Sequence, residues 1–420
     1  MPWWAAMKPS TWPARAKIKM TDALHSPTPV ATPRRTLTER LGNELSFVPV
    51  AIGLIALFVF FASQSDVFLS SRNLSNLLVQ STVTGIIALG LVFVLLTGEI
   101  DLSVAATSGV ASVFMAKIVM DFGMPVPLAI FAAVALGGAI GAASGRWITL
   151  IGVPSFVVTL GVGMVLNGVQ LLLLPRTGRY NLMNSGVDKL AATHVTGALA
   201  WGLILGAILV FALVLGSTWR SRQRAGLDAS FQTGVLLPLA VVALFLIGML
   251  MFLENQRGLP MPVILFLALL GVMSYITSET RFGTYLYAIG NNAEAARRAG
   301  IKVDRIKIIA FAIAGSLAAF GGILSASRSL GVSVSSGGGV GGGALLLESI
   351  AAAVIGGVSL FGGRGMVVGA LFGALIIATV SNGLNLMGVA NEARLIVTGL
   401  LLVIAVSIDR GIERLARPGS

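Results

Sequence analysis

The stretch LSNLLVQSTVTGIIALGLVFVLLT, residues 74–97, decides the fold, and the acidic turn GEID follows it at residues 98–101. The stretch carries no charged residue, and about 20 apolar residues are enough for a helix to cross a hydrocarbon core of roughly 30 Å. Similar apolar runs recur along the chain between short polar segments. The pattern predicts a helix that crosses a membrane, repeated many times.

The composition supports the same fold class. Hydrophobic residues make up 56% of the 420 residues and charged residues only 11%, against about 25% in soluble domains. A water-soluble fold could not bury that much apolar surface. We therefore expect an all-α, polytopic membrane helix bundle.

Twelve apolar runs are candidates for membrane spans. The first run and the last three are short or interrupted by glycine, so we expect ten to twelve spans, with twelve as the best estimate. The runs are Phe47–Ser63, Leu74–Thr97, Leu102–Met120, Val126–Ile148, Pro154–Leu174, Gly197–Ser217, Thr233–Leu253, Pro260–Thr277, Ile306–Ala326, Leu345–Phe361, Met366–Leu386 and Leu395–Ile408.

The basic residues indicate the orientation. Most of the 29 Lys and Arg residues fall in segments that a cytoplasmic N-terminus would place inside. Cytoplasmic loops carry such an excess, so both termini are expected in the cytoplasm. We expect a flexible basic tail at residues 1–46, a membrane domain at 47–410 with a long cytoplasmic loop at 278–305, and a second tail at 411–420.

Several classes of chemistry are excluded. The chain has no cysteine, and its two histidines lie far apart in polar segments, so no metal site is expected. The net charge of +12 follows the loops between spans and does not form a nucleic-acid-binding face. No phosphate-binding loop of the form GxxxxGK[ST] is present.

The most informative polar segment contains a short helix. Asn292 is suited to cap its N-terminus, and Glu294 lies in the first turn, where the helix dipole favours an acid. Gly300 is suited to end it. Two turns of helix are not stable alone in water, so the helix is expected to pack against its own bundle or another protein. Between these ends lie Ala295, Ala296, Arg297 and Arg298.

This segment resembles the "EAA" coupling loop of ABC-importer permeases, and the string YAIGNNAEAARRAGI, residues 287–301, is similar to that loop in the ribose/xylose/galactose branch of monosaccharide permeases. Three further stretches resemble blocks of that branch: EIDLSV at 99–104, PSFVVTL at 154–160 and ESIAAAVIGGVSLFGG at 348–363. The acid at Glu99 and the added apolar sequence around residues 225–262 are most like xylose-type members. The chain departs from the branch at Ser349, Ser381 and the glycine tract 337–343.

The resemblance implies a transport subunit that catalyses nothing. It implies a homodimer or a pair of related permeases, an ABC ATPase subunit that holds ATP and Mg, a sugar-binding protein on the outer face, and the inner membrane of a bacterium. No cofactor is expected on this chain. The residues expected to couple to the ATPase are Asn292, Glu294, Ala295, Ala296, Arg297, Arg298 and Gly300.

Polar residues in or beside apolar runs are candidates for a substrate path or gate. Glu99 and Asp101, with Ser103 nearby, form either a structural turn at the membrane surface or a gate or dimer contact. Glu348 either caps a helix that begins near Ser349, or meets the binding protein or lines the outer mouth. The amides of Asn167, Asn382 and Asn385 suit either sugar hydroxyls or bonds between helices.

The glycines near the C-terminus predict close helix packing or a moving helix that lines the path. They are Gly356, Gly357, Gly365, Gly369 and Gly373. A second class of function stays open from the residues alone: a proton-coupled secondary sugar transporter that uses Glu99, Asp101 or Glu348.

Overall fold

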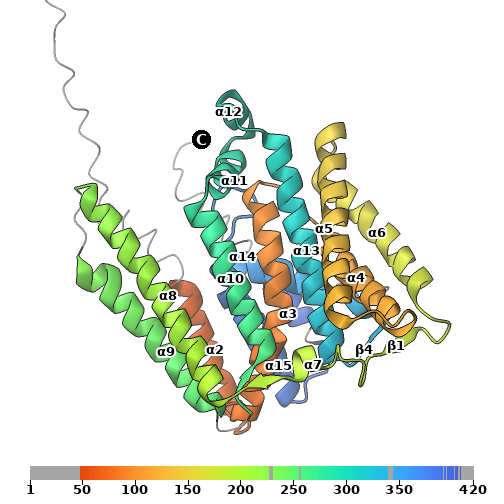
Figure 1. Cartoon of the computed structure of the whole chain (residues 1–420), viewed down its shortest axis with the longest axis horizontal. Coiled ribbons are helices and arrows are strands. Elements are labelled where there is room, and N and C mark those ends of the chain that lie inside the picture. The colour runs from red at the N-terminus through yellow and green to blue at the C-terminus, as the bar shows by residue number, and fades with distance from the viewer. Residues whose placement is uncertain are drawn as a thin grey trace, which may run out of the picture. The chain divides into compact units, whose positions relative to one another are not determined.

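A computed structural model of the chain describes residues 48–226, 230–254, 257–338 and 344–390, with most of 392–404. The chain divides into two units, Met1–Leu45 and Ser46–Ser420, and all that follows concerns the second. The tails expected at 1–46 and 411–420 lie outside the described residues. The second unit is a bundle of helices with very little sheet (Figure 1).

Eight helices in the described part of the chain are long and apolar enough to cross a membrane. Each coincides with one of the predicted runs, because an uninterrupted apolar run satisfies its own backbone hydrogen bonds only as a helix in lipid. They are α3 (Ser71–Leu96), α5 (Val126–Ile151), α6 (Ser155–Leu173), α8 (Gly197–Arg224), η2 with α9 (Gln232–Leu236 and Leu237–Glu254), α10 (Met261–Glu279), α13 (Val303–Arg328) and α15 (Gly369–Leu386).

Three of the predicted runs form shorter helices: α2 (Val48–Gln64), α4 (Val104–Met120) and α14 (Ala344–Ile355). Helix α14 is about 18 Å long at 1.5 Å per residue, which is well short of a hydrocarbon core. The run was predicted to end at Phe361, but the helix ends at Ile355 and is followed by a glycine-rich loop. The last predicted run, Leu395–Ile408, is helical where it is described and otherwise lies outside the described residues.

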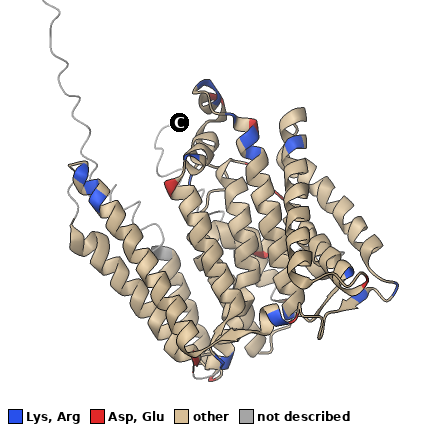
Figure 2. Ribbon diagram, in the orientation of Figure 1, with Lys and Arg blue, Asp and Glu red and all other residues tan. Residues whose placement is uncertain are grey.

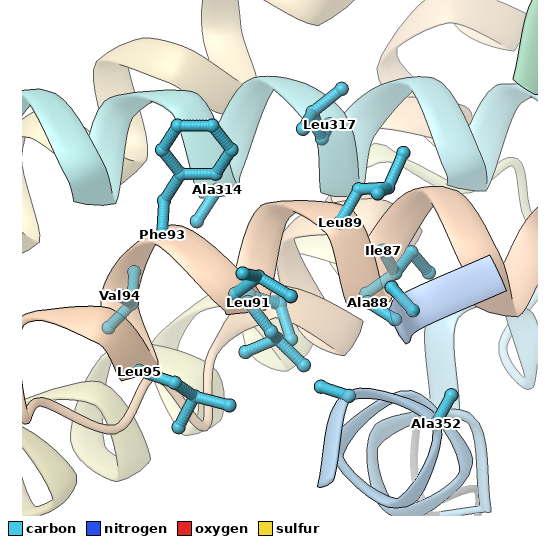
Figure 3. Packing of buried hydrophobic residues seen from close by; sticks show 14 of the residues in the cluster. Ile87, Ala88, Leu89, Leu91, Phe93, Val94, Leu95, Ala314, Leu317 and Ala352 are labelled. Atoms are coloured by element: carbon cyan, nitrogen blue, oxygen red, sulfur yellow. The ribbon is translucent and has the colours of Figure 1, made fainter. Parts of the chain in front are cut away.

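Helix α3 lies at the centre of this bundle. It is buried from Ser81 to Leu96, and it packs against α13, α14 and α15. Figure 3 shows side chains of α3, such as Leu89 and Phe93, directed toward Ala314 and Leu317 of α13. Because α3 has apolar residues on every side, a fully surrounded position is the only one that buries it.

The tightest helix pair is α5 with α13. Gly137, Gly141 and Gly145 lie four residues apart on α5, and added Cβ atoms on the first two would lie 2.4 and 2.0 Å from carbonyl oxygens of α13. Gly315 of α13 is equally close to α5. Small residues at this spacing let the two backbones touch, as in other membrane helix pairs.

The expectation of an all-α fold needs one correction. At the end of the bundle opposite α12, β1 (Arg179–Asn181) pairs antiparallel with β4 (Gly331–Ser333) (Figure 1). A second pair joins β2 (His194–Val195) to β3 (Leu259–Pro260). Between them lies the short helix α7 (Lys189–Ala192). These segments connect helices across polar sequence, where pairing short strands satisfies backbone groups that no helix accommodates.

The β1–β4 sheet is tied to α4 by an acid. Asp121 accepts hydrogen bonds from Lys117 Nζ at 2.9 Å and from the Tyr180 hydroxyl at 2.7 Å. These two hydrogen bonds, the one from Lys117 first, lower the pKa of Asp121 below its usual value. A carboxylate with a lowered pKa stabilises the fold above the ordinary pKa of Asp, and this stability is lost as pH falls through the lowered value.

We therefore expect the β1–β4 sheet to loosen in acid, at pH values below about 4. Amide hydrogen exchange at residues 179–181, followed as pH is lowered, measures this. In Asp121→Asn, these amides should exchange faster at neutral pH, and their exchange should no longer accelerate as the pH falls below about 4. An unchanged acceleration in that variant would show that another group is responsible.

Candidate functional site

The polar segment 278–305 folds into two short helices at one end of the bundle (Figure 1). Helix α11 (Arg281–Asn291) follows the end of α10, and α12 (Ala293–Arg298) connects it to α13. One short helix was predicted there, and α12 is that helix. Helix α11 was not predicted. We call α11 and α12 together the coupling platform, after the loop that this segment resembles.

Helix α12 has a defined cap at each end. The Asn292 side chain accepts a hydrogen bond from Ala295 N at 2.9 Å, which is the N-cap expected from the sequence. At the other end Gly300 has φ +85°, and the N–H groups of Gly300 and Ile301 donate to the carbonyls of Arg297 and Ala296, both at 3.0 Å. This is a Schellman motif, which requires a residue with positive φ at Gly300.

The two faces of α12 differ. Ala296 is buried in a small apolar cluster with Ile289 of α11 and Val303 of α13. Ala295 is exposed on the other face. There Glu294 pairs with Arg297 at 3.4 Å and with Arg298 at 3.3 Å, and the three side chains are 55 to 80% exposed.

Exposed ion pairs of this kind contribute about 0–1 kcal/mol each, so they do little for stability. Figure 2 shows charged residues at both ends of the bundle, this end included, while the middles of the long helices are mostly uncharged. The exposed face of α12 is thus a charged surface on a helix anchored by two small residues, the buried Ala296 and the partly buried Ala293.

Helix α11 is the part of the platform that contacts the bundle at the end of α3. An added Cβ on Gly290 would lie 2.0 Å from Leu96 O, at the end of α3, and 2.3 Å from Gly363 N. The Tyr287 hydroxyl donates to Gly365 O at 2.8 Å, and Asn291 Nδ2 donates to Gly363 O at 3.3 Å. The platform is therefore in direct backbone contact with the glycine-rich loop that links α14 to α15.

Three segments meet at one point, which we call the glycine junction: Gly98, Gly290, Gly362 and Gly363. Gly98 follows α3, Gly290 lies on α11, and the other two lie in the loop between α14 and α15. Gly363 N donates to Leu96 O at 3.0 Å. Added Cβ atoms on Gly290, Gly362 or Gly363 would meet neighbouring atoms at under 3 Å. The loops that follow α3 and α14 satisfy some of their backbone groups by hydrogen bonds to each other, as between Gly363 and Leu96. Non-helical backbone of this kind is tolerated beside lipid only where it is buried in protein.

The acids beside this junction are both engaged. Glu99 forms an ion pair with Lys307 of α13, and both side chains are largely shielded from solvent. Asp101 is buried, and its Oδ1 accepts hydrogen bonds from Ser103 N at 2.8 Å and Ser103 Oγ at 2.6 Å. Ser103 is the N-cap residue of α4. The pair Asp101–Ser103 is thus a structural turn that begins α4.

The PSFVVTL stretch holds the same loop from the other side. Ser155 Oγ accepts from Ile100 N, and Thr159 Oγ1 accepts from Leu102 N, both at 3.0 Å. Two of the stretches that carried the family resemblance therefore meet in space. The loop 97–103 is fixed by side chains of α6 and α13.

The remaining polar candidates lie apart from the coupling platform. Asn382 of α15 and Asn73 of α3 exchange two hydrogen bonds of 2.9 Å and are buried, so this amide joins helices. Asn385 is exposed near the end of α15. Asn167 Oδ1 on α6 is buried and has no hydrogen-bond partner among the described residues. Glu348 lies within α14, which already runs from Ala344, so it cannot be the cap of a helix that begins near Ser349.

The five candidate glycines serve two purposes. Added Cβ atoms on Gly356, Gly369 and Gly373 would lie 1.8 to 2.2 Å from carbonyl oxygens across the α14–α15 contact. Gly357 has φ +87° with open space around it, and Gly365 has φ +130° and lies outside α15. Gly369 and Gly373 thus lie on α15, which begins at Gly369, and Gly365 lies in the loop before it.

A polytopic bundle of apolar helices that carries a small capped helix with a charged face at one end is the arrangement expected of a membrane permease subunit. The family model described as "Branched-chain amino acid transport system / permease component" matches residues 73–406. The chain belongs to this family, and it is a multi-pass bacterial membrane protein.

Relatives are similar over most of their length. The chain is 39% identical to the xylose transport system permease protein XylH of Escherichia coli K12, over 88% of this chain and 92% of the relative. It is 38% identical to XylH of Haemophilus influenzae, over 73% and 80%. It is 31% identical to the ribose import permease protein RbsC of Escherichia coli K12, over 85% and 92%. No solved structure matches the chain.

Proposed function

We propose that this chain is the membrane subunit of an ABC importer for a monosaccharide, D-xylose foremost, and that it forms the translocation path as a homodimer. ATP would be hydrolysed with Mg on a separate ATPase that docks on α12, and a binding protein would deliver the sugar from outside. The observation that carries the proposal is the capped helix α12, which buries Ala296 and presents Glu294, Arg297 and Arg298 to the solvent.

The relatives' names support the sugar and the mode of transport. The matched proteins are named as xylose and ribose permeases, and a further relative at 27% identity, AlsC, is named for D-allose. The acids that a proton-coupled transporter would use near the junction are engaged in fixed structure: Glu99 by Lys307 and Asp101 by Ser103. These fixed partners argue against the proton-coupled alternative at Glu99 and Asp101.

The test is uptake of labelled D-xylose, D-ribose and D-allose in cells that express this chain with its ATPase and binding protein. Inactivating the ATPase should abolish uptake, while collapsing the proton gradient with ATP maintained should leave it. Loss of uptake only on collapsing the gradient would overturn the proposal.

The proposal also places the platform and both termini in the cytoplasm. Ala295→Cys introduces a single thiol into a chain that has no cysteine, at an exposed position on α12. A membrane-impermeant maleimide should label it in inside-out vesicles and not in intact cells. Labelling in intact cells would reverse the topology.

A further inference from the structure

The loop between α3 and α4 is held by three different elements. Lys307 of α13 pairs with Glu99, and α6 accepts hydrogen bonds from the backbone of Ile100 and Leu102. Asp101 closes the turn onto Ser103, where α4 begins one residue later. A displacement of Glu99 is therefore passed to the start of α4 through a short, fully bonded segment.

Lys307 also lies close to the coupling platform. Its neighbour one turn earlier on α13, Asp304, pairs with Arg297 of α12 at 3.5 Å. Val303, at the start of the same helix, packs against Ala296 of α12. The first two turns of α13 thus contact both α12, through Val303 and Asp304, and the Glu99 loop, through Lys307.

We propose that the Glu99–Lys307 ion pair is the link that makes the loop 97–103 and the start of α4 follow the movement of α12. This proposal rests on the proposed function. Glu99 and Lys307 are positioning residues in this scheme, because each acts through the other and through the loop. When an ATPase moves α12, the N-terminus of α13 moves with it, and Lys307 carries Glu99 along.

The burial of the pair suits it to this role. The two side chains are 17 and 18% exposed, whereas those of the ion pairs on α12 are 55 to 80% exposed. Shielding from solvent reduces screening by salt, so a shielded pair holds its geometry better than a surface pair. Removing one partner leaves the other charge largely buried and unpaired, which is more disruptive than the loss of a surface contact.

The backbone contacts of the glycine junction already join the platform to the α14–α15 loop and to the end of α3. Among the described residues, Glu99–Lys307 is the ion pair that bridges the loop before α4 to α13. The glycine junction would move the α14–α15 loop and the end of α3, whereas the Glu99–Lys307 ion pair would move the start of α4.

The experiment measures sugar transported per ATP hydrolysed, in proteoliposomes that hold the chain with its ATPase and binding protein. Glu99→Gln and Lys307→Gln should each lower this ratio at least fivefold while the ATPase still binds and hydrolyses ATP. The exchange Glu99→Lys with Lys307→Glu should restore the ratio to within twofold of wild type. Lys307→Arg, which keeps the charge, should stay near wild type.

Lys117→Gln is the matched control, because it removes a lysine from an ion pair at the other end of α4. It should leave the ratio unchanged. A wild-type ratio in both single variants would overturn the link, and so would a loss of ATPase binding equal to the loss of transport, which would indicate a merely structural role. If the wild-type chain itself shows no ATP-driven uptake, the proposed function fails, and the link fails with it.

Discussion

Gly141→Leu is expected to destabilise the bundle by about 3 kcal/mol or more, the upper range for overpacking a close contact. An added Cβ at this position lies 2.0 Å from Phe311 O and 2.8 Å from Phe311 C, so a whole leucine side chain would have to enter the backbone of α13. Helix α13 cannot move aside freely, because it also packs against α3 and α4. The measurement is the thermal unfolding midpoint and the folded yield in detergent.

Gly202→Leu is the matched control. Gly202 lies in α8, another long apolar helix, and an added Cβ there meets nothing within 4 Å. Both substitutions gain about 1 kcal/mol of intrinsic helix propensity, so the difference between them reports the α5–α13 contact alone. Similar midpoints for the two variants would show that the helices are not in backbone contact at Gly141.

The α5–α13 contact was not predicted, although its signal is present in the sequence. Gly137, Gly141 and Gly145 have the same four-residue spacing as Gly369 and Gly373. The glycines near the C-terminus are denser and dominate the pattern. Spacing alone does not say which helix lies opposite, and the partner glycine of this contact, Gly315, is far away in the chain.

The membrane helices could be predicted because their cause is local. An apolar run such as residues 74–97 has one structure in lipid, and the predicted runs coincide with α3, α5, α6, α8, α9, α10, α13 and α15. The end of α14 and the start of α15 could not be placed in the same way. They are set by positive φ at Gly357, Gly362, Gly363 and Gly365, which hydropathy does not record.

The coupling segment was predictable in its caps and not in its surroundings. Asn292 and Gly300 act on neighbours within a few residues, so their roles could be inferred from the local sequence. Helix α11 was missed because its buried apolar residues, Leu286 and Ile289, are few, and some of the elements that it packs against, such as α3, are distant in the chain. The partners of Glu99 and Thr159 are also nonlocal, and no sequence spacing connects residue 99 to residue 307.

The second large effect is expected from Gly300→Val. Gly300 has φ +85°, where an L-residue costs roughly 1–2 kcal/mol and a β-branched one is a marked outlier. Valine should therefore push the chain out of the Schellman motif and release the carbonyls of Ala296 and Arg297. A six-residue helix held by caps and one buried alanine has little else to keep it formed.

If the ATPase binds only the formed helix, a penalty of about 2 kcal/mol lowers its affinity roughly thirtyfold, since each 1.4 kcal/mol is a factor of ten. Affinity of the purified chain for the ATPase, measured in nanodiscs, checks this, with sugar uptake falling in parallel. Gly300→Asn should lower the affinity for the ATPase much less, because Asn tolerates positive φ better than other residues with a side chain.

Gly123→Val separates strain at a helix end from damage to the coupling helix. Gly123 has φ +65° just after α4, with nothing within 4 Å of an added Cβ, and Gly300 is equally open. The two valines therefore impose the same kind of backbone strain at two different ends of helices. Gly123→Val should leave ATPase affinity unchanged. An equal loss of affinity in both variants would mean that general instability, and not the shape of α12, governs docking of the ATPase.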